Sequence, residues 1–350
     1  MRSHLRTIIV LAIAAALIAL FLHNVDLWRV AASIMHAQPE WLALSIATML
    51  VNLAIRALRW QYLLEPLGHT SFMSSFRATA VGFAASSVLP ARAGEVIRPY
   101  FLARQAPADQ RGRMTATGAF ATIILERLLD LVTVLILLAS FVFVFGKNLA
   151  GVNPTGFALV KWAGLTAGAG AVGLLVVLFV LAGNPSRLAE SLTRLEAFLP
   201  SRLAGMLARV AEKFATGLGA IRKPGRLLVA LVLSFPLWLS IGAGIWAVAV
   251  AFHLAMPFAG SFLVMALLVV GVAVPTPGAV GGFHAAFRFA ATTFFAAPDD
   301  AAVGAAIVLH LFSVGPTLLL GLLFAAHEGL NLSGMRTLAN QADTEGTASL

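Results

Sequence analysis

Residues 76–90, FRATAVGFAASSVLP, form an apolar stretch that runs directly into ARAGEVIRP at residues 91–99. As a helix rising about 1.5 Å per residue, the apolar stretch would cover roughly 22 Å. A helix that crosses a hydrocarbon core of about 30 Å needs about 20 residues. This helix would therefore stop inside a membrane. Its end frees backbone groups that lipid cannot satisfy, so we predict a broken or re-entrant helix that is buried in protein or lines a cavity.

A second apolar stretch is also too short to cross a membrane and also runs into prolines and glycines. Residues Ser261–Val274 would cover roughly 21 Å as a helix, and they run into PTPGAVGG at residues 275–282. The sequence therefore predicts two broken helices. The residues expected to break them are Pro90, Gly94, Pro275, Pro277, Gly278 and Gly281.

The composition places the whole chain in a membrane. Of its 350 residues, 60% are hydrophobic and 11% are charged, whereas a soluble domain has about 45–50% apolar and about 25% charged residues. The absence of cysteine excludes a disulfide scaffold, cysteine-ligated zinc, iron–sulfur clusters and a thiol nucleophile. The chain contains no Walker A, HExxH or GxSxG motif, so we expect no cofactor, no metal and no catalytic residue of these types.

The longer apolar runs predict six full spans, and with the two broken helices they define an all-α polytopic membrane protein. The runs are Thr7–Leu22, Trp41–Arg59, Met114–Phe145, Ala158–Ala182, Leu227–Phe252 and Ala301–Ala326. We interpret residues 1–326 as a single transmembrane domain, followed by a polar tail at residues 327–350.

The net charge of +9 does not indicate a nucleic-acid partner, because the basic residues lie mainly between apolar runs, where their distribution sets the orientation in the membrane. We place the arginines that close the second span, Arg56 and Arg59, on the cytoplasmic side. Both termini are then cytoplasmic, in a bacterial inner membrane. Residues 183–226 read as a basic amphipathic pair of helices on the cytoplasmic lipid surface, which anchors the chain or docks a partner.

The order of the segments predicts an inverted repeat. Residues 7–145 and residues 158–326 each read as span, span, broken segment and span, and the two halves begin on opposite sides. Interrupted segments at corresponding positions of two halves indicate a transporter's binding site. The alternative is that a hydrophobic chain of this length divides by chance into similar halves.

Charged residues follow the first break. An intramembrane arginine or glutamate costs about 2.5–3.5 kcal/mol on insertion scales, so it needs a partner or a charged ligand. We expect Glu95 to pair most easily with Arg98 at i,i+3 spacing, which leaves Arg92 to bind an anion through both edges of its guanidinium. Alternatively, these residues form a cytoplasmic loop whose arginines only fix the topology.

Two further groups of polar residues are candidates. After the second break, His284 and Arg288 share a helical face, where Arg288 would mirror Arg92 or, alternatively, only lie at the interface. Within the long apolar run, Glu126, Arg127 and Asp130 are spaced to neutralise one another. We expect this group to clamp the first broken segment, with a proton relay as the alternative. His310, alone in the last span, is expected to be a satisfied packing residue.

Four motifs carry a resemblance to a known family. They are Arg56-Ala-Leu-Arg59-Trp60, Pro90-x-Arg92-x-Gly94-Glu95-x-x-Arg98, Glu126-Arg127-x-x-Asp130 and Pro275-x-Pro277-Gly278-x-x-Gly281. Together they resemble the lysylphosphatidylglycerol synthase transmembrane-domain family, which is flippase-like and also occurs as stand-alone proteins. Fused members carry a soluble aminoacyl-transferase domain after this region. Because only a short polar tail follows here, we expect a stand-alone member without synthase activity.

The resemblance implies a non-enzymatic transporter that moves an anionic or phosphate-bearing lipid between leaflets, such as a phospholipid, a glycolipid carrier or a hopanoid-pathway lipid. The expected substrate-binding residues are Arg92, Glu95, Arg98, His284 and Arg288. Many relatives carry an acidic residue where this sequence has His284. Two alternatives remain: an integral-membrane lipid transferase, and a non-catalytic scaffold for a lipid-pathway enzyme.

Overall fold

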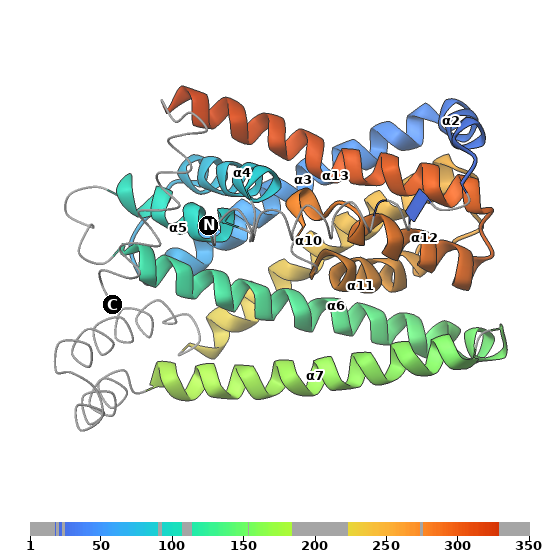
Figure 1. Cartoon of the computed structure of the whole chain (residues 1–350). Helices are drawn as coiled ribbons and strands as arrows, with labels where there is room; N and C mark the ends of the chain where they lie inside the picture. Colours follow the sequence, from blue (N-terminus) through green and yellow to red (C-terminus); the bar gives the residue numbers. More distant parts are fainter. Residues whose placement is uncertain are drawn as a thin grey trace, which may run out of the picture.

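The computed structural model describes residues 18, 21–22, 25–89, 93–106, 114–152, 154–183, 223–273 and 276–328. Every regular element in these ranges is a helix (Figure 1). Several sequence predictions lie wholly or mostly outside the described residues. They are the span Thr7–Leu22, the break residues Pro90 and Pro275, the candidate ligand Arg92, the amphipathic segment 183–226 and the polar tail 327–350.

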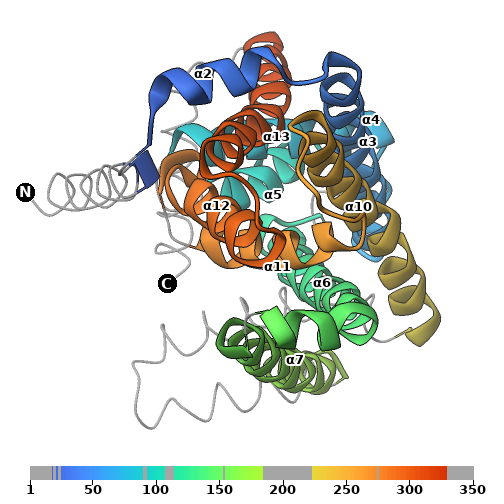
Figure 2. The same cartoon turned by 90° about the vertical axis from the view of Figure 1, so that its right-hand side faces the viewer.

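Within the described ranges, four helices are long and apolar enough to cross a membrane. They are α3 (Pro39–Leu64), α6 (Ala116–Val152), α10 (Pro224–Ala251) and α13 (Asp299–His327). A fifth long helix, α7 (Pro154–Gly183), lies along α6 at the edge of the bundle (Figure 2), and the short α2 (Leu27–Met35) packs on α13. The chain is thus a helical membrane protein, and the total of six spans stays a prediction.

Helices α3 and α10 pack side by side along their lengths. The Ser45 hydroxyl donates to the Gly244 carbonyl oxygen at 3.1 Å, and the Asn52 amide donates to the carbonyl oxygen of Leu237 at 2.9 Å. Residue numbers rise along one helix as they fall along the other, so the two helices are antiparallel. Small and hydroxyl-bearing residues at this interface let the backbones approach closely, as is common between helices in membranes.

Both short apolar stretches form the first arm of a helical hairpin. The first hairpin is α4 (Phe72–Val88) and α5 (Gly94–Arg104), and the second is α11 (Gly260–Ala273) and α12 (Gly282–Phe295). A Cβ atom added to Gly94 would lie 1.7 Å from the carbonyl oxygen of Gly82, and one added to Gly271 would lie 2.4 Å from that of Gly282. Only glycine fits where the arms touch.

The tip of the second hairpin packs against the end of α4, the first arm of the first hairpin. In Figure 1 the first hairpin lies toward one end of the bundle and the second toward the other. A short 3-10 helix, η4 (Pro277–Ala279), forms the second tip and packs on α4. A Cβ atom on Gly278 would lie 3.7 Å from the carbonyl oxygen of Ser87, at the end of α4.

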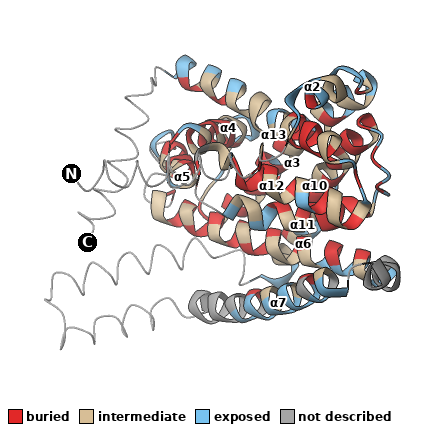
Figure 3. Ribbon diagram, turned by 45° about the vertical axis from the view of Figure 1, so that its right-hand side comes forward, coloured by how far each residue is buried: buried red, intermediate tan, exposed pale blue. Residues whose placement is uncertain are grey.

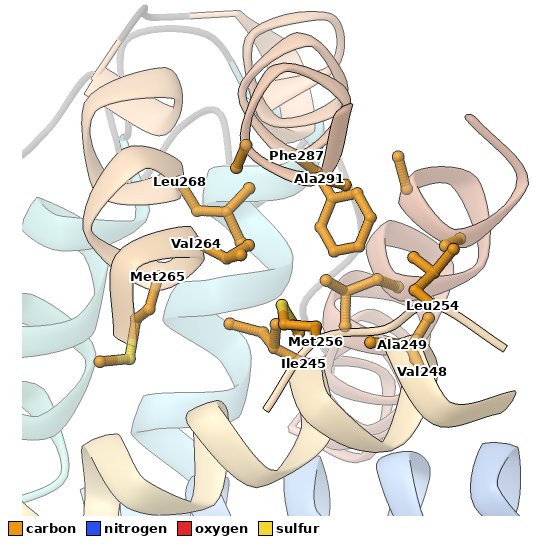
Figure 4. Packing of buried hydrophobic residues seen from close by; sticks show 14 of the residues in the cluster. Ile245, Val248, Ala249, Leu254, Met256, Val264, Met265, Leu268, Phe287 and Ala291 are labelled. Carbon is orange, nitrogen blue, oxygen red and sulfur yellow. The ribbon is translucent and has the colours of Figure 1, made fainter. Parts of the chain in front are cut away.

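Apolar packing fixes the second hairpin in the bundle. Burial is concentrated between the helices, while the described side chains of α7 up to Gly173 are largely exposed (Figure 3). In the largest apolar cluster, Val264 and Leu268 of α11 and Phe287 of α12 face Ile245 and Val248 of α10 (Figure 4). The first hairpin also packs on apolar residues, but buried charges lie beside it as well.

Candidate functional site

Five charged side chains are buried together where α3, α5 and α6 meet, and we call them the arginine–carboxylate cluster. They are Arg56 and Arg59 of α3, Arg98 of α5, and Glu126 and Asp130 of α6. None of these side chains is more than 7% exposed. Arg56 and Arg59, which the sequence places at the cytoplasmic end of the second span, are therefore buried between helices; their side of the membrane stays a prediction.

Glu126 is the centre of this cluster. Its carboxylate oxygens lie 3.4 Å from Nη1 of Arg56, 3.3 Å from Nη2 of Arg59 and 3.2 Å from Nη1 of Arg98. Glu126, which belongs to α6, therefore links α5 of the first hairpin to α3. Each of these bonds forms in a protein interior, where one unpaired charge would be costly.

Asp130 lies one turn further along α6 and completes the pairing. Its Oδ1 atom is 2.7 Å from Nη1 of Arg59, and the indole N–H of Trp238 donates to the same oxygen at 2.9 Å. Spacing of i,i+4 on α6 and i,i+3 on α3 places the two carboxylates opposite the two arginines.

Trp60 supports the cluster from α3. Its indole N–H donates to Oγ1 of Thr122 at 3.0 Å, and the Arg98 guanidinium carbon lies 3.8 Å from the centre of its ring. This cation–π contact holds the guanidinium plane of Arg98 in one orientation.

The predicted pairing within the first broken segment is wrong. Glu95 pairs across helices with Arg127 at 3.3 Å, while Arg98 pairs with Glu126. The reason is that α5 packs on α6, which offers an acid and a base at adjacent positions, and the buried carboxylate binds the buried arginine. Arg127 is 38% exposed and lies 3.5 Å from Asp130, so it contributes to the predicted clamp only from its rim.

The cluster holds one more positive charge than negative, because three arginines face two carboxylates. Nε and Nη2 of Arg98 and Nε of Arg59 are buried and have no hydrogen-bond partner within the described part of the chain. Buried donors without partners are uncommon and costly. One edge of Arg98 therefore holds Glu126, and the donors of the other edge have no partner in this part of the chain.

A pair of histidines lies at the second tip. The imidazole rings of His284 and His310 are 4.5 Å apart between centroids. Nδ1 of His284 accepts the Gly281 N–H at 3.3 Å, and His310 donates through Nε2 to the carbonyl oxygen of Gly278 at 2.7 Å. His310 is thus a hydrogen-bonded packing residue, as predicted, and it contacts His284 because α13 passes directly beside the start of α12.

Arg288 is already paired. Its guanidinium donates from Nε to Oδ1 of Asp299 at 2.6 Å and also bonds the second carboxylate oxygen and the carbonyl oxygen of Phe21. The residue predicted to mirror Arg92 thus links α12 to the start of α13. Of the predicted site residues, Arg98 lies with Glu126 and Asp130, Glu95 and Arg127 border them, and His284 and Arg288 lie in the other hairpin.

Sequence reasoning gave no functional role to Arg56, Arg59, Trp238 or His310. The first two had a usable signal, namely two arginines one turn apart in an apolar helix, which predicts a shared buried partner. Trp238 lies 108 residues from Asp130 and His310 lies 32 residues from Gly278, and local spacing in a single sequence does not reveal such contacts.

Apolar helices that surround two hairpins, with charged side chains buried among them, define a polytopic membrane protein. The sequence model for the lysylphosphatidylglycerol synthase TM region matches residues 7–321, so the chain belongs to this family. A search of curated proteins found no match. Membership in this family points to a function related to membrane lipids.

Proposed function

We propose that this protein moves an anionic or phosphate-bearing lipid between the two leaflets of the membrane. The observation that carries this proposal is the buried arginine–carboxylate cluster, which has a surplus positive charge and unpartnered donors on Arg98. It lies beside the first hairpin, whose helix α4 contacts the tip of the second hairpin. Family membership supports a lipid as the cargo.

In this mechanism the first hairpin binds the headgroup. Glu126 and Trp60 hold one edge and one face of Arg98, so its Nε and Nη2 atoms are oriented for the two oxygens of a phosphate. Arg92, which lies between α4 and α5 in the sequence, would add a second cation. A headgroup that enters between the tips leaves its acyl chains in the surrounding lipid, so only the polar part crosses protein.

Matching contacts between helices support the predicted inverted repeat of residues 7–145 and 158–326. In the repeat, α4, α5 and α6 correspond to α11, α12 and α13. Helix α4 packs on α13, and its counterpart α11 packs on α6. Likewise, α5 packs on α6, and its counterpart α12 packs on α13. Helices α3 and α10, which correspond to each other, are antiparallel partners at the centre. The close glycine contact in each hairpin falls at the same place. An inverted repeat would bring the two re-entrant hairpins in from opposite faces.

The proposed topology, with six spans and cytoplasmic termini, predicts where single introduced cysteines react with an impermeant maleimide. Cysteines at His69 and Gln105 should both be labelled only from the cytoplasmic side, because the first hairpin returns to its starting face. A cysteine at Lys147 should be labelled only from outside. The native chain has no cysteine, so each label reports one position. Labelling of position 105 from outside would mean that the first hairpin crosses completely.

The transport proposal is tested with purified protein in vesicles that contain a fluorescent phosphatidylglycerol. We expect the wild type to exchange this lipid between leaflets. Arg98→Lys keeps the charge but loses the planar fork, so we expect at least about a tenfold slower exchange, the scale of one lost charge-assisted hydrogen bond. Arg104→Lys, in the last turn of the same helix and exposed, is the matched control and should behave as wild type.

Two other outcomes would replace this proposal. If the wild type moves no lipid under any imposed gradient, the scaffold function gains support. If the mass of the lipid changes during incubation, the protein is a transferase, with Glu95, Glu126 or His284 as acid or base. Wild-type exchange by well-folded Arg98→Lys would remove Arg98 from headgroup binding.

A further inference from the structure

The start of α12 has the backbone geometry of an anion site. This 14-residue helix begins at Gly282 and follows two glycines with positive φ, Gly278 at 59° and Gly281 at 88°. The first N–H groups of an α-helix have no partner within the helix, and they lie at the positive end of its dipole. A helix N-terminus of this kind is suited to binding phosphate or carboxylate groups.

A second observation at the same place points to a ligand. His284, in the first turn of α12, is 9% exposed, and within the described residues its Nε2 atom has no hydrogen-bond partner. His310 uses Nε2 for the Gly278 carbonyl oxygen, and no bond to its Nδ1 is found in the same part of the chain. Each imidazole, that of the buried His284 and that of the half-buried His310, therefore has one ring nitrogen without a partner in this part of the chain, beside a helix N-terminus.

In the described part of the chain, the charged residues near the two imidazoles do not compensate a proton. Helix α11, which packs on α12, has no ionisable residue, and α4 has only Arg77, near its distant end. On α12 itself the only other ionisable residue is Arg288, which is bound to Asp299 of α13. The second acid of α13, Asp300, lies 3.9 Å from Arg29. The ring neighbours of His284 are Phe21, Phe283 and His310.

We infer that the N-terminus of α12, together with His284 and His310, is a proton-dependent binding site for an anionic headgroup. A proton on the histidine pair would be a buried charge without a counter-ion, which is unfavourable unless an anion lies beside it. Without the proton, an anion would contact two neutral imidazole rings and would be attracted only by the helix dipole, so it would bind weakly. Proton and anion therefore bind together, and each raises the affinity for the other by the same factor.

This inference rests on the proposed function only for the use of the site in transport. The first hairpin would carry its positive charge at every pH, through the arginine–carboxylate cluster. The second would become positive only when an imidazole is protonated. A headgroup passing from the first tip to the second would then be accompanied by a proton.

The test measures binding without transport. The melting temperature of the full-length protein in detergent is recorded with and without short-chain phosphatidylglycerol, at about pH 7.5 and about pH 5.5, which bracket the titration of an ordinary imidazole. The lipid phosphodiester stays ionised throughout, so the pH acts on the protein. We expect a larger lipid-induced shift at the lower pH, because a tighter ligand stabilises the folded state more. Zwitterionic phosphatidylcholine should give no such difference.

Two substitutions remove the titration and keep the hydrogen bonds. In His284→Asn the amide oxygen still accepts the Gly281 N–H, and in His310→Gln the amide still donates to the Gly278 carbonyl. Both variants should lose the pH-dependent part of the shift, while His69→Gln, at an exposed loop histidine, should keep it. As a second measurement, adding phosphatidylglycerol to weakly buffered protein should cause proton uptake in the wild type but not in the two variants.

An equal shift at both pH values in the wild type would overturn the inference, as would a pH-dependent shift retained in both histidine variants. Either result would leave the transport proposal standing. Conversely, wild-type protein that shows the linked binding but exchanges no lipid would retain the site and reject the transport function.

Discussion

Glu126→Ala is expected to be among the most damaging substitutions in this protein. Glu126 contacts Arg56, Arg59 and Arg98 while fully buried, so its loss leaves three buried cations with only Asp130. Breaking a buried ion pair by removing one partner typically costs about 3–5 kcal/mol. We expect a large fall in folded yield and in the melting temperature in detergent.

The adjacent residue provides the control. Arg127→Ala removes a charge from the same helix, but that side chain is 38% exposed and lies at the rim, where an ion pair is worth about 0–1 kcal/mol. Its melting temperature should stay close to that of the wild type. Similar destabilisation by both substitutions would show that Glu126 is not the centre of the cluster. A stable Arg127→Ala protein that has lost transport would instead support a relay.

Gly94→Ala is the second substitution with a large expected effect. Its Cβ atom would lie 1.7 Å from the carbonyl oxygen of Gly82 and 2.4 Å from Oγ of Ser86. A backbone carbonyl in a packed helix has little room to move, so the arms must separate. We expect destabilisation beyond the about 1–3 kcal/mol of ordinary overpacking, together with loss of lipid exchange.

Gly271→Ala tests the second hairpin in the same way, since its Cβ atom would meet the Gly282 carbonyl oxygen at 2.4 Å. The control is Gly170→Ala on α7, where nothing lies within 4 Å and alanine favours the helix by about 1 kcal/mol. The measurement is the melting temperature of the three variants, which should fall for the two hairpin variants and not for Gly170→Ala. Normal stability of both hairpin variants would contradict the close packing of the arms.

Lengths and breaks of helices were accessible from the sequence because they depend on local properties. The apolar run at residues 76–90 is too short to cross a membrane, and the structure ends α4 at Val88 and begins α5 at Gly94. The run at Ser261–Val274 corresponds to α11 in the same way. The length of an apolar run and the backbone conformations allowed to proline and glycine depend only on neighbouring residues, so a single sequence reveals both.

Pairing of charges was less accessible because it depends on which helices become neighbours. Spacing along one helix predicted Glu95 with Arg98, but α6 supplies better partners for both. The same limit applies to Arg288, whose partner Asp299 follows a turn and begins the next helix. From one sequence, the presence of buried charges could be predicted from their cost, whereas their partners required the tertiary arrangement.

The composition of the arginine–carboxylate cluster has a consequence for the biogenesis of the protein. Helix α3 carries Arg56 and Arg59, but the carboxylates that neutralise them are on α6, 70 residues later for Arg56 and Glu126. When α3 leaves the ribosome, each arginine would cost about 2.5–3.5 kcal/mol in lipid. Helix α3 is therefore expected to wait beside the insertion machinery until α6 has been synthesised, so that the two helices enter the bilayer as a neutralised pair.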